Sequence, residues 1–188
     1  MGIPIATKGE AAIPPWLKSA GSPCRDTMIT VGLLTISDSA AKGEREDVSG
    51  ETLRSLIAQL PDVVIEAGAI IPDEQDQIAT LLRMWSDEKQ LNLILTTGGT
   101  GLAPRDVTPE ATKAVIEREA PGIAEALRAI SLQYTRTAML SRGVAGVRGR
   151  TLIINLPGSP KAVKECLEYI LPVLPHAINL IVDGPKEH

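Results

Sequence analysis

The sequence predicts a three-layer α/β/α domain with a mostly parallel sheet over residues 29–182. Short apolar runs, typical of strands buried on both faces, alternate along the chain with segments whose apolar residues recur at helical spacing. Alternating strands and helices form parallel sheets with right-handed crossovers, which place helices on both faces. The length of 188 residues corresponds to about one domain plus a tail.

Four short apolar runs are the predicted strands: residues 31–36, 63–71, 91–96 and 151–156. Four segments match the amphipathic helix pattern, with apolar residues at positions i, i+3, i+4 and i+7. Their apolar sets are Leu53, Leu56, Ile57 and Leu60; Ile78, Leu81, Leu82 and Trp85; Ile123, Ala126, Leu127 and Ile130; and Val163, Cys166, Leu167 and Ile170. A weaker helix is expected over residues 109–119. Because Cys166 belongs to an apolar set, we expect it to pack in the core rather than to react.

The two ends of the chain lie outside the predicted domain. Prolines interrupt any regular period in residues 1–28, which we expect to be a flexible or surface-draped extension; docking onto a neighbouring subunit is the alternative. Residues 183–188 are expected to form a C-terminal tail. Residues 1–30 contain no continuous apolar segment of a secretory signal. The apolar stretch 169–182 is too short to span a bilayer and is broken by prolines. We therefore expect a cytoplasmic protein without a membrane partner.

Composition argues against several kinds of ligand. The four aromatic residues are too few for a platform that stacks single-stranded nucleic acid. Nineteen basic and 23 acidic side chains give a net charge of −4, so no overall positive field attracts phosphates. Two cysteines without a CxxC motif and two histidines argue against a disulfide framework or a structural zinc site. We expect no nucleic-acid partner, and any phosphate must be bound by a local site.

Polar and glycine residues follow each predicted strand, at the edge where open parallel α/β sheets bind ligands. Ser37 and Asp38 follow the first strand, and Asp73 follows the second. The third is followed by Thr97-Gly98-Gly99-Thr100-Gly101, and the last by Pro157-Gly158-Ser159. This convergence predicts a ligand site at the carboxyl ends of the strands.

Residues 97–101 have the composition of an anion-binding loop. Gly98, Gly99 and Gly101 permit positive φ and close backbone approach, so that successive N–H groups can converge on a phosphate. Thr97 and Thr100 add hydroxyl donors. The chain contains no GxxxxGK motif, and residues 99–101 lack the third glycine of GxGxxG. A tight strand-to-helix turn without a ligand is the alternative.

Asp106 and Asp73 are the candidate acidic residues. Thr108 is a plausible N-cap ahead of Pro109, which leaves Asp106 free, and a carboxylate beside a phosphate suggests Mg²⁺ between them. The alternative for Asp106 is an Asx turn or an ion pair with Arg105. The alternative for Asp73 is the N-cap of the helix that follows.

Other candidates lie in the last loop and among the basic residues. Ser159 is predicted to be an N-cap, with Pro160 at the first helical position, and a helix N-terminus presents free N–H groups to anions. Arg142 and Lys161 are candidate basic residues, and solvated surface charges are the alternative.

Taken in order along residues 29–182, these motifs resemble the MogA/MoaB family of molybdenum-cofactor biosynthesis proteins, and more narrowly its MogA branch, which is related to the G domain of gephyrin. The ordered set is Ser37-Asp38, Asp47-x-Ser49-Gly50, Pro72-Asp73-Glu74, Thr97–Gly101, Arg105-Asp106-Val107-Thr108-Pro109-Glu110, Ser141-Arg142 and Leu156-Pro157-Gly158-Ser159-Pro160.

The resemblance implies a molybdopterin adenylyltransferase, which transfers AMP from ATP to the terminal phosphate of molybdopterin, releases pyrophosphate and requires Mg²⁺. It implies a homotrimer and a molybdate-inserting partner enzyme. It carries the catalytic and metal-binding roles onto Asp73 and Asp106. The nucleotide and pterin sites map to Ser37, Asp38, Thr97, Gly98, Gly99, Thr100, Gly101, Ser141, Arg142, Pro157, Gly158 and Ser159.

Three other functions stay open at this point. The first is a MoaB-like protein that binds molybdopterin without adenylylation, although the chain keeps both aspartates. The second is a scaffold, as gephyrin uses related domains. The third is a phosphatase or hydrolase, but no GxSxG elbow with a histidine partner is present.

Overall fold

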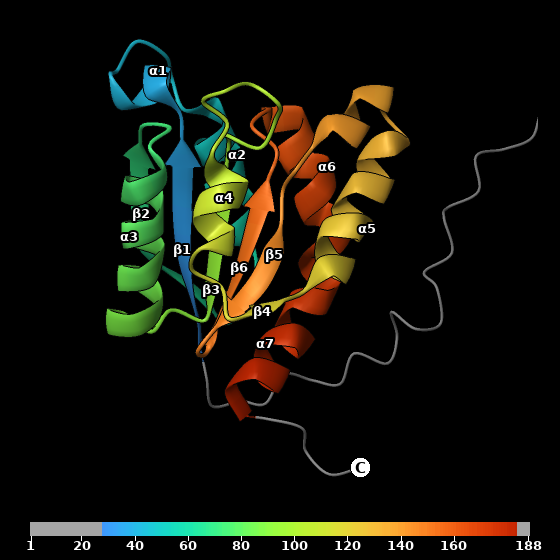
Figure 1. Cartoon of the computed structure of the whole chain (residues 1–188). Helices are drawn as coiled ribbons and strands as arrows, with labels where there is room; N and C mark the ends of the chain where they lie inside the picture. The colour runs from blue at the N-terminus through green and yellow to red at the C-terminus, as the bar shows by residue number, and fades with distance from the viewer. Residues whose placement is uncertain (1–27, 184–188) are drawn as a thin grey trace, which may run out of the picture.

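The computed structural model describes residues 28–183, and one six-stranded sheet forms its centre (Figure 1). The strand order is β2-β1-β3-β6-β5-β4. The strands are β1 (Ile29–Ile36), β2 (Val63–Ile71), β3 (Leu93–Thr97), β4 (Arg118–Glu119), β5 (Ala145–Arg148) and β6 (Thr151–Leu156). The first four in the order are parallel, and β5 and β4 are antiparallel. The predicted mostly parallel sheet is confirmed. The expectations for the two chain ends fall almost wholly outside the described residues.

The parallel strands end at one level, which gathers the loops that follow them. Thr35 pairs with Thr97, and Thr97 pairs with Leu156. The loops after β1, β2, β3 and β6 therefore meet at one edge of the sheet, which is the upper edge in Figure 1.

Helices cover both faces of the sheet. They are α1 (Asp38–Ala41), α2 (Val48–Ile57), α3 (Gln75–Arg83), α4 (Thr108–Lys113), α5 (Pro121–Leu132), α6 (Pro160–Ile170) and α7 (Leu174–Asp183). Three short helical segments accompany them: the π-helix η2 (Met84–Glu88) and the 3₁₀-helices η3 (Arg136–Leu140) and η4 (Leu171–Val173).

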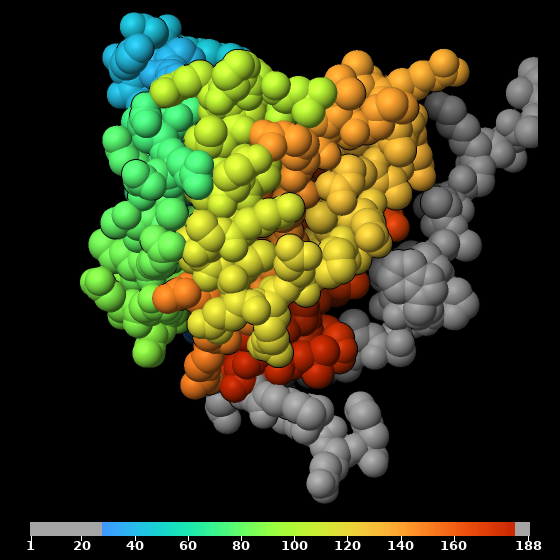
Figure 2. All heavy atoms as spheres, in the orientation of Figure 1, coloured from blue at the N-terminus to red at the C-terminus, as the bar shows by residue number. Residues whose placement is uncertain are grey.

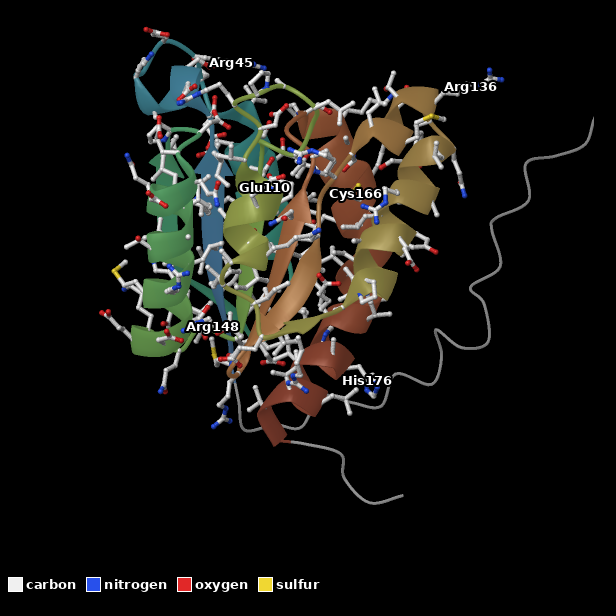
Figure 3. The ribbon with its side chains drawn as sticks, in the orientation of Figure 1. Arg45, Glu110, Arg136, Arg148, Cys166 and His176 are labelled. Carbon is white, nitrogen blue, oxygen red and sulfur yellow. The ribbon has the colours of Figure 1, made fainter. Side chains whose placement is uncertain are left out.

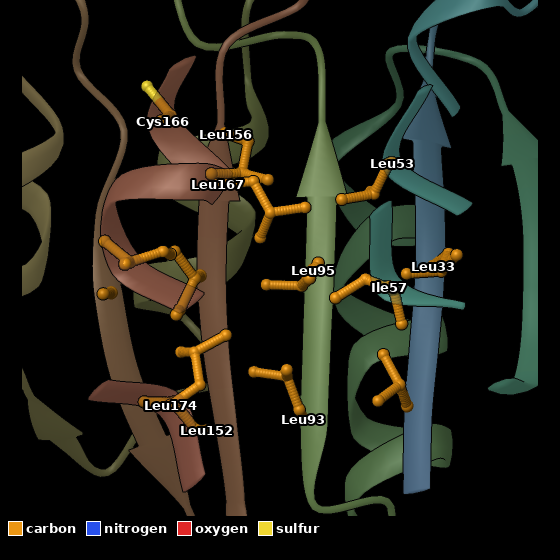
Figure 4. Close-up of a cluster of buried hydrophobic side chains, with 14 of the residues drawn as sticks. Leu33, Leu53, Ile57, Leu93, Leu95, Leu152, Leu156, Cys166, Leu167 and Leu174 are labelled. Carbon is orange, nitrogen blue, oxygen red and sulfur yellow. The ribbon is translucent and has the colours of Figure 1, made fainter. Parts of the chain in front are cut away.

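The alternation of side chains along each strand divides the core into two layers. In β3, Leu93 and Leu95 pack with α2, α5, α6 and α7, whereas Ile94 packs with α3 and α4. Successive strand residues point to opposite faces, so both faces of the sheet are apolar and both are covered. Figure 4 shows the first layer, with Leu95 between β1 and β6. The three-layer architecture is therefore confirmed.

Side-chain caps set the starts of two helices beside the carboxyl edge. Asp47 Oδ1 accepts the N–H of Gly50 at 2.9 Å and caps α2. Ser159 Oγ accepts the N–H of Ala162 at 3.2 Å and caps α6, whose first residue is Pro160. The capping role predicted for Ser159 is confirmed.

The N-cap predicted for Thr108 is wrong, the alternative of an N-cap at Asp73 is not formed, and the weak helix expected over residues 109–119 is shorter than predicted. Glu74, not Asp73, precedes α3, and Val107 precedes α4, so that Thr108 lies inside the helix. The helix expected over residues 109–119 ends at Lys113, and the chain then leads into β4; Glu117, just before β4, donates through its N–H to Val147 O at 2.8 Å. This pairing with β5 ends the helix, and local periodicity does not report a partner about 30 residues away in sequence.

The segment Pro160–Val182 is long and apolar enough to cross a membrane by length and composition alone. In the fold it is divided by η4, and it contributes Leu167, Ile170, Leu174 and Ile178 to the core layer that faces the sheet. We therefore interpret it as a pair of core helices.

Candidate functional site

The glycine loop after β3 presents a row of free N–H groups at the carboxyl edge. Gly98 and Gly99 have φ values of +101° and +61°, which L side chains rarely adopt. A Cβ on Gly98 would lie 2.1 Å from Ile36 O, so only glycine fits there. Within residues 28–183, no protein acceptor takes the N–H groups of residues 98–101. Free N–H groups in a turn with positive φ values can bind an anion.

Thr108 fixes the direction in which this loop faces. Its hydroxyl donates to Gly98 O at 2.9 Å, and its N–H donates to Gly99 O at 3.1 Å. Both loop carbonyls are therefore held against the start of α4, which leaves the N–H groups free. The sequence had predicted Thr108 as a helix cap, but its hydroxyl holds the loop instead.

The two threonines of the loop differ in what their hydroxyls contact. Thr97 is fully buried, and its hydroxyl donates to Pro157 O at 2.7 Å, which ties β3 to the loop after β6. The predicted donation from the Thr97 hydroxyl to a ligand phosphate therefore does not fit the structure. Thr100 lines a cavity, and its hydroxyl has no hydrogen bond to the protein within residues 28–183.

Asp73 faces the glycine loop from the end of β2. A Cβ on Gly99 would lie 2.9 Å from Asp73 Oδ1. Oδ2 accepts the N–H of Asp38 at 2.9 Å, and the N–H of Asp73 donates to Asp38 Oδ1 at 3.2 Å. Burial raises the pKa of Asp73, and the negative charges of Asp38 and Asp106 raise it further. The hydrogen bond from the Asp38 N–H lowers the pKa but does not cancel this rise. Cations or N–H donors would favour the charged form here.

Asp106 lies next to the same loop and follows it in the chain, whereas Asp73 precedes it. A Cβ on Gly101 would lie 2.8 Å from Asp106 Oδ2, and this oxygen accepts the N–H of Ala103 at 2.7 Å. The Asx turn is not formed, because the Asp106 carboxylate accepts an N–H three residues before it and the Thr108 N–H donates to Gly99 O. Its Oδ1 has no protein partner within residues 28–183. The ion pair with Arg105 is not formed.

Arg105 instead joins two other loops. It bonds Asp38 through Nε at 3.0 Å and Nη2 at 2.8 Å, and it bonds Glu74 through Nη1 at 2.8 Å. The hydrogen bond from Arg105 lowers the pKa of Asp38. The Asp38 carboxylate thus accepts hydrogen bonds from Arg105 and from the Asp73 N–H. Asp38 lines neither of the two cavities described below.

The two carboxylates beside the glycine loop would suit a magnesium ion that is shared with the phosphates of a ligand, rather than a metal held by protein alone. Among residues 28–183, no group of three or more His, Cys, Asp or Glu side chains could hold a metal. Mg²⁺ is commonly bound through one or two carboxylates plus substrate phosphates and waters. Asp73 Oδ1 and Asp106 Oδ1 would be the protein ligands, and phosphates on the loop would complete the site.

Arg142 forms hydrogen bonds with three residues between Gly101 and Glu110, which span the end of the loop and the start of α4. Its Nε donates to Gly101 O at 2.7 Å, its Nη2 donates to Asp106 O, and its Nη1 pairs with Glu110. Partial burial would raise the pKa of Glu110, but the Arg142 bond lowers it. Arg142 lines neither cavity, so the structure places its side chain in the scaffold of the site.

Replacing Arg142 by lysine is expected to reduce turnover at this site about 10²-fold. The lysine ammonium is a point charge and cannot bond all three acceptors of the guanidinium, so the loop that carries Asp106 would shift. Misplacement of a site residue has effects of about this size. The lost bonds should lower the free energy of unfolding by about 2–3 kcal/mol. Urea unfolding and steady-state kinetics measure both effects.

The matched control is Arg148→Lys. Arg148 donates to both carboxylate oxygens of Asp87 and to Val115 O, next to β4 and away from the carboxyl edge. We expect a similar loss of stability, with turnover within about twofold of wild type, because Arg148 shares no contact with the glycine loop and distant sites act independently. Equal turnover in both variants would contradict a site-holding role for Arg142.

The remaining predicted residues lie at the same edge. Ser37 caps α1, and Ser141 Oγ accepts the N–H of Gly143 at 3.4 Å. Pro157 O and Gly158 O accept hydroxyl bonds from Thr97 and Ser49, both at 2.7 Å. These carbonyls anchor the loop that carries Ser159. Lys161 lies outside both cavities, on the exposed surface of α6.

Two adjoining cavities open on this edge. The larger, of about 380 Å³, lies between the glycine loop, α5, η3 and the start of α6, and has Thr100, Ser141 and Ser159 on its wall. The smaller, of about 230 Å³, lies between β1, the segment before α2 and Asp73, and has Ser37 on its wall. Gly99, Asp106 and Gly158 line both. Figure 2 shows the yellow-green loop that carries Asp106 on the surface between α1 and η3.

The larger cavity contains residues that sequence reasoning missed. Arg128 and Ser131 of α5 line it, and neither belongs to a recognisable motif. Cys166 also lines this cavity. Figure 3 labels it on α6, on the side of α5. Cys166 is buried, burial raises the pKa of its thiol, and it bonds the Ser131 hydroxyl at 3.2 Å. The expectation that Cys166 packs in the core is confirmed.

The fold and the site define an α/β protein in which two cavities meet at a glycine loop that lies next to two aspartates. A family model described as "Probable molybdopterin binding domain" matches residues 32–176. The chain therefore belongs to the MogA/MoaB family.

Three similar proteins illustrate the relationship. Molybdopterin adenylyltransferase of Helicobacter pylori J99 is 46% identical over 155 residues, which are 82% of this chain and 88% of that protein. Molybdenum cofactor synthesis protein cinnamon of Drosophila melanogaster is 51% identical over 82% of this chain but only 26% of its own length. The crystal structure of the molybdopterin biosynthesis enzyme MoaB of Thermus thermophilus has a TM-score of 0.79 and 53% identity, and the match covers 85% of this chain and all of that one.

Proposed function

We propose that this chain is a molybdopterin adenylyltransferase, which transfers AMP from ATP to the terminal phosphate of molybdopterin and releases pyrophosphate. The main support is the position of Asp73 beside Gly99 and of Asp106 beside Gly101, in a loop with free N–H groups where two cavities meet. A reaction between two phosphorylated substrates needs two adjoining binding spaces. The H. pylori relative carries this activity in its name and is matched over most of its length.

Each cavity suits one part of the reaction. The larger has the volume of a small-molecule site and a partly apolar wall of Ala124, Leu127 and Ala162, which suits a flat heterocycle. The smaller is lined mainly by polar groups, including Ser37, Asp47 and Ser49. We assign the pterin to the larger cavity and the triphosphate to the smaller, with the reacting phosphates at Gly99.

The transfer itself needs little acid–base chemistry. A phosphate oxygen of molybdopterin attacks the α-phosphorus of ATP, the bond to the β-phosphate oxygen breaks, and pyrophosphate leaves with the electron pair. The attacking phosphate is already ionised near neutral pH, so no strong base is required. The N–H groups of residues 98–101 would bind the charge on the transferred phosphate, and the N-terminus of α6 at Ser159 would bind the acceptor phosphate. When bound, Mg²⁺ would neutralise charge that otherwise keeps the substrates apart.

Further parts of the proposal concern the protein in the cell. We propose that the protein is a cytoplasmic homotrimer that passes its product to a molybdate-inserting enzyme. Exposed apolar side chains near the end of α5 and in η3 support an assembly: Leu132, Tyr134, Met139 and Leu140. Light scattering after gel filtration measures the mass of the assembly.

The decisive experiment incubates the protein with ATP, Mg²⁺ and molybdopterin. We expect adenylylated molybdopterin and pyrophosphate in equal amounts, and a loss of both on chelation with EDTA that is restored by added Mg²⁺. Binding of molybdopterin without AMP transfer would contradict the proposal and favour a MoaB-like binding protein. Release of inorganic phosphate without molybdopterin would favour a hydrolase.

A further inference from the structure

The wall of the larger cavity opposite the glycine loop carries an unneutralised cation, Arg128. This wall is formed by α5 and η3. Among the described residues that line the cavity, the charged ones are Arg128 and Asp106 alone. The apolar residues and hydroxyls between them supply no second positive charge. A positive charge in this position favours a ligand that carries negative charge.

Arg128 has no acidic partner within residues 28–183, since the ion pairs of that part of the chain are formed by other cations. In contrast, Arg105, Arg142 and Arg148 each pair with a carboxylate. A partly buried guanidinium without a counter-charge carries a desolvation cost, which an anionic ligand would offset. The charge of Arg128 therefore indicates an anion in the cavity.

The guanidinium is held in place by one bond and keeps its other donors. Nη1 of Arg128 donates to Gly143 O at 2.9 Å. A guanidinium has five N–H donors in a fixed fork, so four remain without a protein acceptor within the described residues. This leaves the paired donors that recognise phosphate oxygens.

The bond to Gly143 also places Arg128 near the reacting groups. Arg142 N donates to Thr100 O at 2.9 Å, so the segment from Ser141 to Gly143 lies beside the glycine loop. Ser141 and Thr137 add hydroxyls to the same cavity, and Ser159 lies on its α6 side. A phosphate between Arg128 and the start of α6 would be next to Gly99, where the two cavities meet.

We propose that Arg128 binds the terminal phosphate of molybdopterin and orients it for attack, and this inference rests on the proposed function. The cavity to which Arg128 belongs is the one assigned to the pterin substrate, while the smaller cavity holds the triphosphate of ATP. Arg128 is thus a specificity residue that distinguishes phosphorylated from dephosphorylated pterin.

The test measures binding of three probes separately: molybdopterin, its dephosphorylated form and Mg-ATP. In Arg128→Gln, the Kd for molybdopterin should rise about 10- to 100-fold, as expected for the loss of a charge-assisted phosphate contact. The Kd for the dephosphorylated form and for Mg-ATP should change less than about twofold. KM for molybdopterin should rise more than kcat falls.

Two further variants control for charge and fold. Arg136→Gln removes the same charge at η3, where Figure 3 shows the side chain pointing away from the protein, and all three affinities should stay at wild-type values. Arg128→Lys keeps the charge but not the fork, so the Kd for molybdopterin should fall between wild type and Arg128→Gln. If Arg128→Gln does not fold, the Kd of Arg128→Lys for molybdopterin still tests the role of Arg128.

The outcomes separate this inference from the proposed function. If wild-type protein transfers AMP but Arg128→Gln binds molybdopterin normally, the role of Arg128 is wrong and the function stands. If the glutamine variant loses affinity for Mg-ATP instead, Arg128 serves the nucleotide and the inference is overturned. If Arg128 controls phosphate-dependent binding but wild-type protein transfers no AMP, the inference stands and the proposed function is wrong.

Discussion

Replacing Asp106 by asparagine should reduce AMP transfer at least about 10²-fold, because charge stabilisation by a metal held there amounts to several kcal/mol. The fold should be unchanged. Asparagine keeps a side-chain oxygen that can accept the Ala103 N–H, so the turn at residues 103–106 can persist. What is lost is the negative charge of Oδ1, which no residue in the described range partners. Pyrophosphate release from ATP and molybdopterin measures the effect, and urea unfolding verifies the fold.

Asp76→Asn is the matched control for this change. Asp76 lies exposed in the first turn of α3, so the same charge is removed away from both cavities. Its turnover should stay near the wild-type value. Turnover of Asp106→Asn within about twofold of this control would remove Asp106 from the mechanism, since changes in reacting groups have far larger effects.

A double variant tests whether the two aspartates act through one group. Asp73→Asn alone should also lose most AMP transfer. If Asp73 and Asp106 hold the same ion, Asp73→Asn/Asp106→Asn should be little slower than either single variant, because groups that act as a unit are not additive. Losses that multiply would show two independent roles and contradict the shared magnesium site.

Replacing Gly98 by alanine should both destabilise the protein and abolish transfer. The new Cβ would lie 2.1 Å from Ile36 O, in a backbone conformation with φ +101°. Overpacking and a left-handed φ together should lower the free energy of unfolding by about 3 kcal/mol. Relief of the clash has to displace the loop from β1, which disorganises the N–H groups of residues 98–101. Urea unfolding and pyrophosphate release at a temperature where the variant is folded measure the two effects.

Gly149→Ala separates the two causes of strain. Gly149 also has a positive φ, +52°, but a Cβ there would meet nothing within 4 Å. Its cost should be that of the φ alone, about 1 kcal/mol, with full turnover. A Gly98→Ala variant that is as stable and active as Gly149→Ala would contradict the tight fit of the loop against Ile36.

The sequence predicted most of the fold because its signals are local. Strands β1, β2, β3 and β6 are continuous apolar runs, and α2, α3, α5 and α6 follow the helical period. Strands β4 and β5 gave no such signal. Both are short, and β4 forms because Arg118 and Glu119 pair with β5, a contact between distant residues. Pairing of this kind depends on the partner strand more than on intrinsic preference.

The site divides in the same way. The glycine loop follows β3 directly and Asp73 follows β2 closely, so a rule about the carboxyl edge of parallel sheets located them. Asp106 lies further along the loop after β3 and was identified from the residues around it. Arg128 lies in the middle of α5, and only the packing of α5 beside η3 brings it to the cavity. Contacts with distant residues also changed two predicted roles. The Thr97 hydroxyl, predicted to donate to a ligand, bonds Pro157 O, and the Thr108 hydroxyl, predicted to cap a helix, bonds Gly98 O.

The alternation of strands and helices and the places of the glycine loop and both aspartates along the chain could be predicted from local patterns, because apolar periodicity and glycine conformation act over a few residues. Which polar groups stay free for a ligand depends on contacts made on folding. A hydroxyl, carboxylate or guanidinium is available or occupied according to acceptors and donors that the fold brings from elsewhere in the chain. Thr97, Asp38 and Arg142 are held by the protein, whereas Thr100, Asp106 Oδ1 and Arg128 face the space where the substrates would meet.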